Sequence, residues 1–340
     1  MIPEFFRVDP SWDEQIERIV AAVERVAAIE GTAADTPTLR RATRVGAVHS
    51  SVVIEGNRLS PVEAVAVANG DVVLAPQRDV EELRNALAAY ELVDRLDPWS
   101  VGDLLEAHRV LTTGLVAEAG AFRTVDVEIV NPFGDVIHTG SRHAKVPRLV
   151  AELLEWGRAC EHHPLVVSGA VHFLIEHIHP FRDGNGRIGR LWQTLILTRW
   201  EPLFAWTPTE TLIAAHQSGY YEALQASRDP DIDAAPFISF MLGVIGDALR
   251  GYEDAATRHV GINVGTHGAA ERDPAEVVLR LITADPHITA AGLAARMGLT
   301  ARHVERLIKR LRDEGRLVRV GSRKAGQWRT VTSRDASWRG

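Results

Sequence analysis

The chain has 340 residues, of which 46% are hydrophobic and 24% charged, and its net charge is −7. This length allows two domains, and the composition excludes a globally disordered chain. The single cysteine excludes an internal disulfide framework, and with an N-terminus that lacks a signal-peptide apolar run it favours a cytoplasmic protein. No stretch approaches about 18 uninterrupted apolar residues, so we expect no membrane partner.

Charge divides the chain into two parts. Residues 272–340 contain 15 Lys and Arg against 7 Asp and Glu, a net charge of +8, which leaves −15 for the rest of the chain. An acidic body followed by a basic tail indicates two parts that meet different partners.

Most of the acidic body shows helical periodicity. Apolar residues recur every three or four positions in the segments 13–30, 39–55, 79–94, 101–114, 147–160, 164–178, 186–199, 209–227 and 235–250. The second of these closes on Glu55, and Gly56 suits the left-handed position just past a helix end. The segment 164–178 is apolar on most sides, which indicates a central, buried helix. The body is therefore predicted to be mainly α-helical.

One stretch of the body alternates like a strand. Residues 125–130 read VDVEIV, the following NPFGD supplies turn residues, and Val136, Ile137 and His138 resume an extended pattern. This order predicts a β-hairpin with its turn around residues 132–134.

The basic tail has the order of a winged helix-turn-helix. Small and polar residues at 256–272 indicate a linker. Three helices follow, at 274–284 and in AAGLAARM and ARHVERLIKRLRDE, and then RLVRV and QWRTV form a two-stranded wing. We therefore expect a winged-helix domain at 273–335, after an N-terminal helical region at 1–95 and a core at 96–255.

The third tail helix carries basic residues beside its apolar stripe. Arg302, Arg306, Lys309 and Arg310 fall off the stripe and are candidate contacts to DNA phosphates or bases. Winged helices also dock proteins or form dimers. DNA, a protein and a second copy of the chain are therefore all candidate partners.

The segment 179–190 reads HPFRDGNGRIGR and has the parts of a phosphate site. Gly184 and Gly186 permit backbone angles that turn successive N–H groups toward an anion, and the helix that follows adds its positive N-terminal end. Arg187 and Arg190 lie three apart on one face of that helix. Two guanidinium groups beside such a nest suit a polyphosphate better than a single phosphate.

Two further residues of this segment supply chemistry. A carboxylate next to phosphates commonly holds Mg²⁺, and Asp183 lies in the same loop. His179, at the end of the apolar helix, is a candidate base because an unperturbed imidazole titrates near pH 6.5. Together these parts indicate displacement at a phosphorus with a metal on the leaving phosphates.

The segment resembles the signature of the Fic family of AMP transferases, HPFx(D/E)GNGRxxR, at every specified position. Further resemblance lies in GAFRTVDVEI at 120–129, in VPRLV at 146–150 and in YYEALQASRDPDIDAAPFISFM at 220–241, and it covers roughly residues 40–250. It implies a Fic-type helical core with a hairpin flap. The implied reaction is transfer of AMP from Mg²⁺·ATP to a Ser, Thr or Tyr hydroxyl of a target protein.

The resemblance also implies a role for each matching residue. His179 deprotonates the hydroxyl that attacks the α-phosphorus, and Asp183 binds Mg²⁺. The phosphates are held by Gly184, Asn185, Gly186, Arg187 and Arg190, the last of which takes the γ-phosphate. The hairpin with Val136, Ile137 and His138 is the flap, whose edge pairs with an extended segment of the target.

The nucleoside side of the site follows from the same resemblance. Tyr220 and Tyr221 match positions near the nucleoside, although plain packing is the alternative for both. A later family position that is often Asn is Arg228 here, which leaves ATP and another nucleotide open as substrates.

An upstream segment resembles the inhibitory motif of the family, (S/T)xxxE(G/N). It reads SVVIEGN at 51–57 and places Ser51 and Glu55 four apart on one helix face. The resemblance implies that Glu55 pairs with Arg190. A carboxylate in that position removes the partner of the γ-phosphate and adds negative charge where the triphosphate binds. We therefore expect an autoinhibited enzyme.

Plainer interpretations exist for each of these residues. His179 can be a helix-end histidine, Asp183 a loop cap, Glu55 a solvent-facing residue, and the two arginines surface ion-pair partners. His172, His177 and His179 do not share one helical face, so we expect no histidine metal site. Two other functions stay open: removal of AMP from a modified protein, and a DNA-binding regulator whose core senses a nucleotide.

Overall fold

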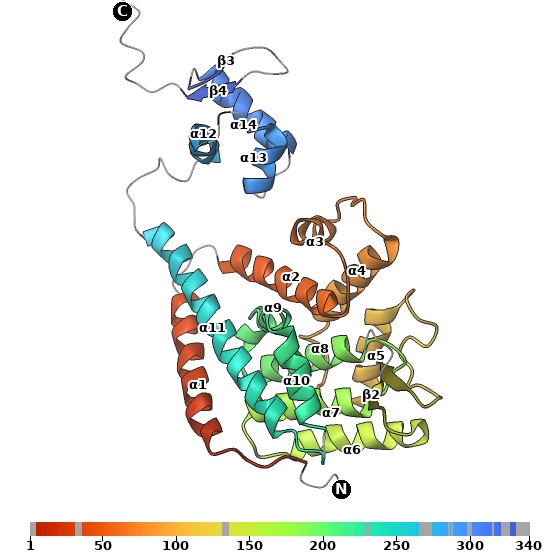
Figure 1. The fold of residues 1–340 in the computed structure, drawn as a ribbon. Helices are drawn as coiled ribbons and strands as arrows, with labels where there is room; N and C mark the ends of the chain where they lie inside the picture. The colour runs from red at the N-terminus through yellow and green to blue at the C-terminus, as the bar shows by residue number, and fades with distance from the viewer. Residues whose placement is uncertain are drawn as a thin grey trace, which may run out of the picture. The chain divides into compact units, whose positions relative to one another are not determined.

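The structure is a computed structural model, and the chain divides into two compact units, Met1–Asn263 and Val264–Gly340. The residues that it describes are 5–30, 36–130, 136–228, 231–264, 274–284, 286, 288–297, 301–314, 316–320 and 327–330. Both units are mainly helical, as the periodicity predicted (Figure 1).

The first unit is built from helices around a buried central pair. The helices are α1 (Ser11–Glu30), α2 (Thr36–Ile54), α3 (Pro61–Ala68), α4 (Gln77–Glu91), α5 (Val101–Thr112), α6 (Val146–Ala159), α7 (Pro164–Ile178), α8 (Asn185–Trp200), α9 (Thr209–Ala215), α10 (Gln217–Ala226) and α11 (Ala235–Val264), with short 3₁₀ turns η1 (His143–Lys145) and η2 (Pro202–Ala205). Almost every side chain of α7 and α8 is buried. These two helices pack against each other at the centre of the unit (Figure 1).

The end of α2 has the geometry that its sequence predicts. Gly56 adopts a φ of 93°, and its N–H donates to the carbonyl of Val53 at 2.9 Å. The N–H of Asn57 donates to the carbonyl of Val52 at 3.1 Å. This pair of bonds is a Schellman cap with glycine in the left-handed position. It leaves Glu55 at the last turn of the helix with a defined direction.

Three local features differ from the expectations. The segment 209–227 is divided into α9 and α10, because the backbone of His216 (φ −117°, ψ 37°) leaves the helical region. The short helix α3 was not predicted, although Ser60 and Glu63 form a capping box at its start. Helix α11 continues to Val264, so residues 256–264 of the expected linker are helical, while residues 265–273 lie outside the described residues.

Burial accounts for the continuation of α11 past residue 250 as far as Ala256. Tyr252 and Ala256, four positions apart on one face of the helix, are both buried. A helical face that continues to pack favours continuation of the helix over a linker. The expected linker is therefore wrong for its first nine residues.

The predicted hairpin is present. Strands β1 (Glu128–Val130) and β2 (Val136–Thr139) pair antiparallel, with Glu128 opposite Thr139 and Ile129 opposite His138. The register shifts between Ile129 and Val130, as in a β-bulge. The turn residues 131–135 lie outside the described residues.

The second unit has the predicted order of a winged helix. It contains α12 (Pro274–Ala284), α13 (Ala290–Met297), α14 (Ala301–Asp313) and the antiparallel strands β3 (Leu317–Val320) and β4 (Gln327–Thr330). The expected apolar stripe of α14 is confirmed, because Val304, Leu307, Ile308 and Leu311 are all buried in the core of this unit. Four basic residues of α14 are exposed, namely Arg312 and the predicted Arg306, Lys309 and Arg310. The side chain of Arg302 lies outside the described residues.

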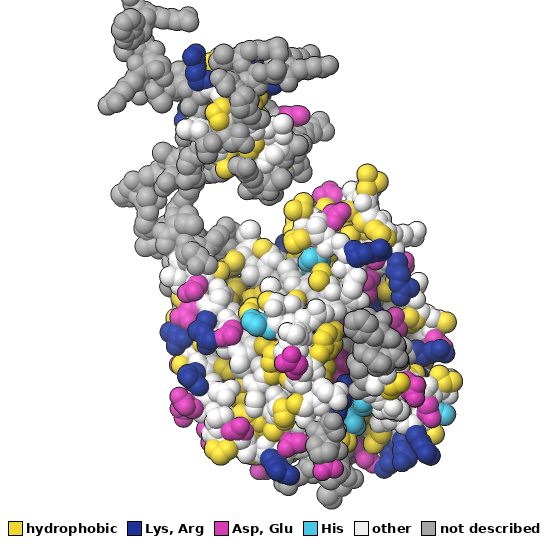
Figure 2. Space-filling view, in the orientation of Figure 1, with side chains coloured by type: hydrophobic (Ala, Val, Ile, Leu, Met, Phe, Trp, Pro, Cys, Tyr) yellow, Lys and Arg dark blue, Asp and Glu magenta, His cyan; other side chains and the backbone are white. Residues whose placement is uncertain are grey.

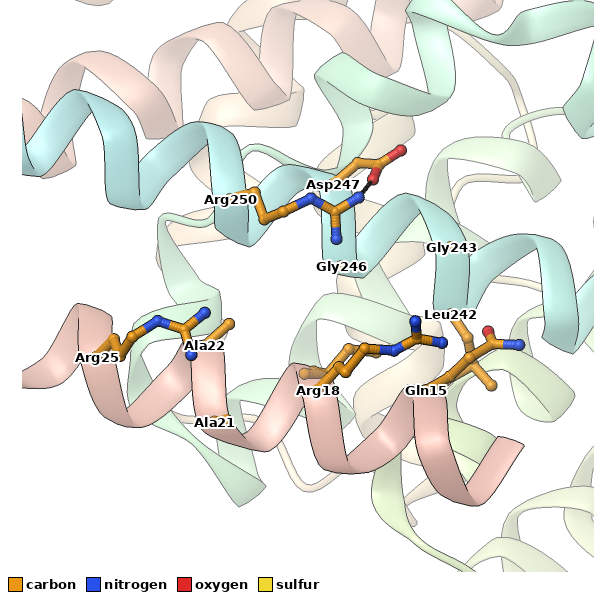
Figure 3. Close-up of a pocket in the computed structure, with 11 residues that line it drawn as sticks. Gln15, Arg18, Ala21, Ala22, Arg25, Leu242, Gly243, Gly246, Asp247 and Arg250 are labelled. Atoms are coloured by element: carbon orange, nitrogen blue, oxygen red, sulfur yellow. Dashed lines mark hydrogen bonds and ion pairs between the residues drawn. The ribbon is translucent and has the colours of Figure 1, made fainter. Parts of the chain in front are cut away.

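The outer surface of the first unit carries acidic and basic side chains interspersed on the face shown in Figure 2. Helices α1 and α11 run side by side, and a groove between them has Ile19, Ala22 and Leu242 among its lining residues (Figure 3). Its rim arginines have acidic partners, such as Asp247 for Arg250. None of the predicted site residues lines this groove. Within the described residues, no helix is both long and apolar enough to cross a bilayer.

Candidate active site

The central feature of the site is His179, which caps the C-terminal end of α7. Its φ of 53° is the only positive φ of a non-glycine residue in the described part of the chain, and its N–H donates to the carbonyl of Ile175 at 2.9 Å. Such a backbone costs on the order of 1 kcal/mol and turns the chain abruptly out of the helix. Burial lowers the pKa of the imidazole to about 4, and Nδ1 has no hydrogen-bond partner. His179 is therefore neutral at pH 7 and able to accept a proton.

The loop after His179 is held by bonds within itself. The side-chain amide of Asn185 donates to the carbonyl of Phe181 at 2.9 Å, and its oxygen accepts from the N–H of Phe181 at 2.9 Å. The side chain of Asn185 therefore shapes the loop, and it is engaged by Phe181 rather than free for a ligand.

A second clamp on the loop comes from His108 of α5, which sequence reasoning missed. Its ring stacks on Phe181 at 3.7 Å between centroids, and its Nδ1 accepts from the N–H of Gly120 at 3.0 Å. The other nitrogen, Nε2, must then donate to the carbonyl of Asp183, which lies at 3.0 Å. Burial lowers the pKa of His108 to about 4, which keeps this neutral tautomer. No local pattern around His108 marks it, because its partners lie 12 and 75 residues away.

Helix α8 begins directly after this loop. Gly184 is its N-cap residue with a φ of 86° and no side-chain cap, and the first amides of a helix have no partner within it. At Gly186, a Cβ would collide with a carboxylate oxygen of Glu55, so only glycine lets that group approach the helix so closely. The start of α8 thus presents backbone N–H groups and a positive dipole end to an acidic group.

Arg187 is buried and ion-paired on two sides. Its side chain is 4% exposed, and it donates to Oδ1 of Asp183 at 2.8 Å and to Glu82 of α4. Glu82 also accepts from the side-chain amide of Asn57 at 2.8 Å. Arg187 therefore positions Asp183 and joins α8 to the segment behind α2. Glu82 and Asn57 are site residues that the sequence did not indicate.

Arg190 is held by the end of α2. Its side chain is 1% exposed, its Nε donates to Oγ of Ser51 at 2.9 Å, and its Nη2 donates to the carbonyl of Ser51 at 2.9 Å and to Glu55 at 2.7 Å. Burial alone would lower the pKa of this guanidinium, but the carboxylate of Glu55 raises it, so the group is always charged. Nη1 is buried without a partner. The structure thus brings Ser51, Glu55 and Arg190 together.

A second carboxyl group lies on the same side of α8. The position of a Cβ on Gly186 would be 3.1 Å from Oε1 of Glu176 and 3.1 Å from Nη1 of Arg190. Glu176 is buried, and burial, followed by the nearby charge of Glu55, raises its pKa. The guanidinium of Arg190 therefore faces two acidic side chains, of which only Glu55 bonds to it directly.

The flap is tied to the catalytic loop by Arg123. Its Nε donates to the carbonyl of His179 at 2.7 Å and its Nη1 to the carbonyl of Val125 at 2.7 Å, and it also donates to the carbonyl of Ser141. These bonds join residues on both sides of the hairpin to the end of α7. Sequence reasoning quoted the segment that contains Arg123 but gave this residue no role.

The predicted flap residues lie beside the end of α7. His138 approaches the carbonyl of His177 at 2.7 Å through Nε2, which must donate because a carbonyl only accepts. Val136 is exposed, as an edge residue that meets a partner must be. The side chain of Ile137 lies outside the described residues.

The two tyrosines differ from each other. Tyr220 is 1% exposed. Its hydroxyl lies 3.1 Å from Nε2 of His172 and donates to a carboxylate oxygen of Glu176 at 3.3 Å. Its ring packs in the core, which agrees with the alternative of plain packing. Tyr221 is exposed on the neighbouring position, with its hydroxyl 3.5 Å from the carbonyl of Ile54. Arg228 donates to the carbonyl of Glu176 at 3.1 Å and leaves its buried Nε without a partner.

Asp183 fits a magnesium ion that is shared with phosphates. Its side chain is 41% exposed, with one oxygen on Arg187 and the other 3.6 Å from Arg78. The described residues contain no group of three or more His, Cys, Asp or Glu side chains that could hold a metal by themselves. Mg²⁺ usually keeps several waters and needs only one or two carboxylates plus substrate phosphates, which is what this loop offers.

Known proteins resemble both units. Residues 98–197 match the Fic/DOC family, and residues 277–318 match the winged helix-turn-helix DNA-binding family. A Fic family protein from Desulfovibrio desulfuricans G20 has a crystal structure with a TM-score of 0.65 and 34% identity, covering 96% of this chain and 98% of that one. A Fic domain containing signaling protein from Bacteroides thetaiotaomicron, at 18% identity and a TM-score of 0.58, shares the fold over 71% of this chain and 97% of that one.

Two curated relatives carry the name protein adenylyltransferase Fic. The one from Culex quinquefasciatus is 27% identical over 240 residues, which are 67% of this chain and 45% of that protein. The one from Aedes aegypti is 29% identical over 206 residues, 57% of this chain and 38% of that protein. The chain thus spans less than half the length of these relatives.

Proposed function

This chain belongs to the Fic family, and on that premise we propose that it is a protein adenylyltransferase, which transfers AMP from ATP to a hydroxyl of a target protein. The observation that carries the proposal is the position of His179. A neutral, buried imidazole with a free nitrogen ends α7, and the unpaired amides of α8 begin six residues later. A base next to a polyphosphate site is the arrangement that displacement at the α-phosphorus needs.

The reaction balances with the residues at hand. His179 takes the proton of the target hydroxyl as its oxygen forms a bond to the α-phosphorus. The bond between the α-phosphorus and the bridging oxygen of the β-phosphate breaks, and pyrophosphate leaves with that electron pair. The N–H groups at the start of α8 stabilise the charge on the phosphate oxygens, and Arg190 neutralises the γ-phosphate.

Asp183 would hold Mg²⁺ at this site. When bound, the ion neutralises charge on the leaving phosphates. The ion pair of Asp183 with Arg187 fixes the carboxylate in the loop, and its side chain, 41% exposed, stays accessible to the ion. Arg187, with 4% of its side chain exposed, acts through Asp183 and the loop rather than on the nucleotide.

The flap supplies the place for the target. Val136 and His138 lie on an edge strand beside His179, and an extended segment of another protein can pair with such an edge. Main-chain pairing reads little sequence, so it brings a hydroxyl to His179 with few demands on the target.

Glu55 would keep the enzyme inhibited. Its carboxylate occupies the guanidinium that the γ-phosphate needs, and it lies against Gly186 where the phosphates pass. A triphosphate bound with this carboxylate in place lacks its partner and meets like charge, which misaligns the α-phosphorus. Loss of the ion pair is therefore the activating step.

Labelling with α-³²P-ATP and Mg²⁺ tests the proposal. We expect weak auto-modification by the wild-type protein, strong modification by Glu55→Gly, and none by His179→Ala. Glu161→Gly, which removes an exposed acid just before the N-terminal end of α7, the end opposite His179, should behave like the wild type. No modification by Glu55→Gly under any condition would rule out the switch, and release of AMP from a modified protein without pyrophosphate would support the reverse, de-adenylylating activity.

The proposal includes ATP as the nucleotide substrate and the cytoplasm as the location of the protein. Arg228 stands where an Asn is frequent in the family, so the labelling should be repeated with the other three α-labelled nucleotides. A cytoplasmic location, where ATP is available, and a homodimer both stay predictions.

The winged-helix unit is proposed to bind DNA. Its α14 exposes Arg306, Lys309 and Arg310 on the side away from the buried stripe, and Arg329 of β4 is exposed on the wing. Such basic residues neutralise phosphates and make binding depend on salt. Salt-dependent retardation of duplex DNA by the wild-type chain, reduced by Arg306→Ala, tests this second activity. Capture of a protein partner without DNA binding would favour the docking alternative.

A further inference from the structure

A cationic pocket lies at the end of α2 that is remote from Glu55. It has a volume of about 490 Å³, within the range of small-molecule sites. One wall is the N-terminal half of α2, and the other comes from α3, α4 and Trp206. Three arginines of α2 line it, namely Arg40, Arg41 and Arg44. None of the predicted site residues lies in this pocket.

Two of these arginines, Arg41 and Arg44, bond to neutral acceptors. Arg41 donates to the side-chain oxygen of Asn69 at 3.1 Å, and Arg44 donates to the carbonyl of Tyr90. Both acceptors are neutral, and neither arginine has a carboxylate partner among the described residues. Glu91 is the single acidic residue of the lining. Two guanidinium groups whose charge is uncompensated favour an anion, and Arg suits phosphate through paired N–H donors.

The rest of the pocket is apolar and aromatic. Val45, Ala68 and Leu87 line it, and the guanidinium of Arg40 lies over the ring of Trp206 at 3.9 Å. A stack of a planar cation on an indole holds that side of the pocket rigid. Inorganic phosphate alone would leave this apolar wall in water, whereas a phosphate ester with a flat ring would cover it.

We propose that this pocket is a second nucleotide site, which binds a nucleoside phosphate with its phosphate on Arg41 and Arg44 and its base against Val45, Ala68 and Leu87. Concavity favours a small molecule over a nucleic-acid duplex, because residues from four segments of the chain line the pocket. The site is separate from the active site, since Arg41 and Glu55 are about 20 Å apart along the helix at 1.5 Å per residue.

The ligand of this pocket holds α2 in the position that inhibits the enzyme. One wall belongs to α2, and the opposite wall to α4 and Trp206, so a ligand that touches both binds only while α2 is docked. A ligand shifts an equilibrium toward the state that it binds. The docked state is the one in which Glu55 meets Arg190. The pocket is therefore a co-inhibitory site. This regulatory role rests on the proposed function, whereas the binding of a nucleoside phosphate does not depend on it.

A chain of hydrogen bonds connects the pocket with α8. Arg44 donates to the carbonyl of Tyr90, whose hydroxyl donates to Glu210 at 2.7 Å. Glu210 also accepts from the hydroxyl of Thr194 at 2.9 Å, one turn after Arg190 on α8. Tyr90, Glu210 and Thr194 are buried and Arg44 is half-buried, so a shift of α2 at Arg44 disturbs the packing around Arg190.

Isothermal titration calorimetry with AMP tests the binding. In the wild-type chain we expect AMP to bind, and inorganic phosphate to bind at least about tenfold more weakly, since it leaves the apolar wall uncovered. Arg41→Gln should weaken AMP binding about tenfold, the loss of one charge-assisted hydrogen bond. Arg41 is exposed, so this variant should fold. Arg18→Gln, an equally exposed arginine of α1, is the matched control and should bind AMP as the wild type does.

Equal AMP affinity in the wild type and Arg41→Gln would overturn the proposal, because all AMP would then bind elsewhere. Equal affinity for phosphate and AMP would overturn the nucleoside part of it.

Auto-modification tests the regulatory half. AMP should lower the wild-type rate without competing with ATP, and should do so much less in Arg41→Gln. Linkage requires that AMP also bind more weakly to Glu55→Gly than to the wild type. The ratio of the two affinities equals the factor by which AMP favours the docked state of α2. Purely competitive inhibition that is the same in wild type and Arg41→Gln would contradict co-inhibition. If no variant transfers AMP but calorimetry still depends on Arg41, the proposed function fails and the binding site stands.

Discussion

The two arginines in the first turns of α8 and the exposed basic side chains of α14 have opposite surroundings. Arg187 and Arg190 are almost fully buried, and each donates to a carboxylate from a distant segment, Glu82 for Arg187 and Glu55 for Arg190. On α14, Arg306 and Lys309 point to solvent while the opposite side of the helix builds the core. A buried guanidinium is stable only with its partners in place, so changing a partner changes the state of the site. An exposed one is available to a ligand from the start, and its loss leaves the fold intact.

The largest expected effect of a substitution concerns the rate of AMP transfer. In the Glu55→Gly background, His179→Ala should lower auto-modification about 10²- to 10⁴-fold, the usual contribution of a general base. The rate of labelling with α-³²P-ATP measures it. Arg306→Ala in the same background should leave the rate unchanged. A His179→Ala rate within a factor of about three of its parent would remove the base from the mechanism.

The next effect is on stability. Arg190→Ala should lower the free energy of unfolding by about 3 kcal/mol, because it leaves Glu55 and Glu176 beside each other without their cation. Glu55 is 32% exposed and can turn to water, which keeps the loss at the lower end of the range. Chemical denaturation of the first unit, followed by tryptophan fluorescence, measures it. A loss of unfolding free energy below about 0.5 kcal/mol would mean that Arg190 does not compensate the charges of these two carboxylates.

Acid should destabilise the first unit through its buried histidines. Burial lowers the pKa of His172 to about 3 and that of His108, His177 and His179 to about 4. The unfolded chain takes up protons near pH 6.5, whereas the folded chain does not until about pH 4. Stability is therefore lost as the pH falls from 6.5 toward 4, by up to about 1.4 kcal/mol per pH unit for each such histidine.

Denaturation curves at pH 7.5, 6.5, 5.5 and 4.5 measure this dependence. His172→Gln is the matched variant, since glutamine can still bond to Gln193 and Tyr220, and it should reduce the slope by the share of one histidine. A flat dependence between pH 6.5 and 4.5 would show that these rings are protonated in the folded protein.

The smallest expected effect on stability concerns the exposed basic residues of α14. Arg306→Ala should change the stability of the winged-helix unit by less than about 0.5 kcal/mol. If the unit binds DNA, the same change should lower the slope of log K against log salt by about 0.9. Fluorescence anisotropy with a labelled duplex at several salt concentrations measures it. A large loss of stability from Arg306→Ala would erase the contrast between the two groups of basic side chains.

Much of the fold follows from local patterns in the sequence. Helical periodicity placed most helices within a few residues, and Gly56 marked the end of α2. The capping box of Ser60 and Glu63 is an equally local signal for the start of α3. The helix itself has only eight residues, which is too few for its periodicity to stand out. The errors at His216 and at residues 256–264 arose where packing, rather than propensity, decides whether a helix continues.

The sequence by itself determined the loop that carries the predicted site, since the spacing in HPFRDGNGRIGR sets a loop and the first turn of a helix. Only the tertiary structure decided what each of them touches. The partners Glu82, His108 and Arg123 come from segments far along the chain, and they reach the loop because α4, α5 and the flap pack around α7 and α8. The same packing buried Tyr220 and left Tyr221 exposed. Local geometry extends over one turn of helix, whereas an ion pair between residues 135 positions apart depends on the whole core that holds them together.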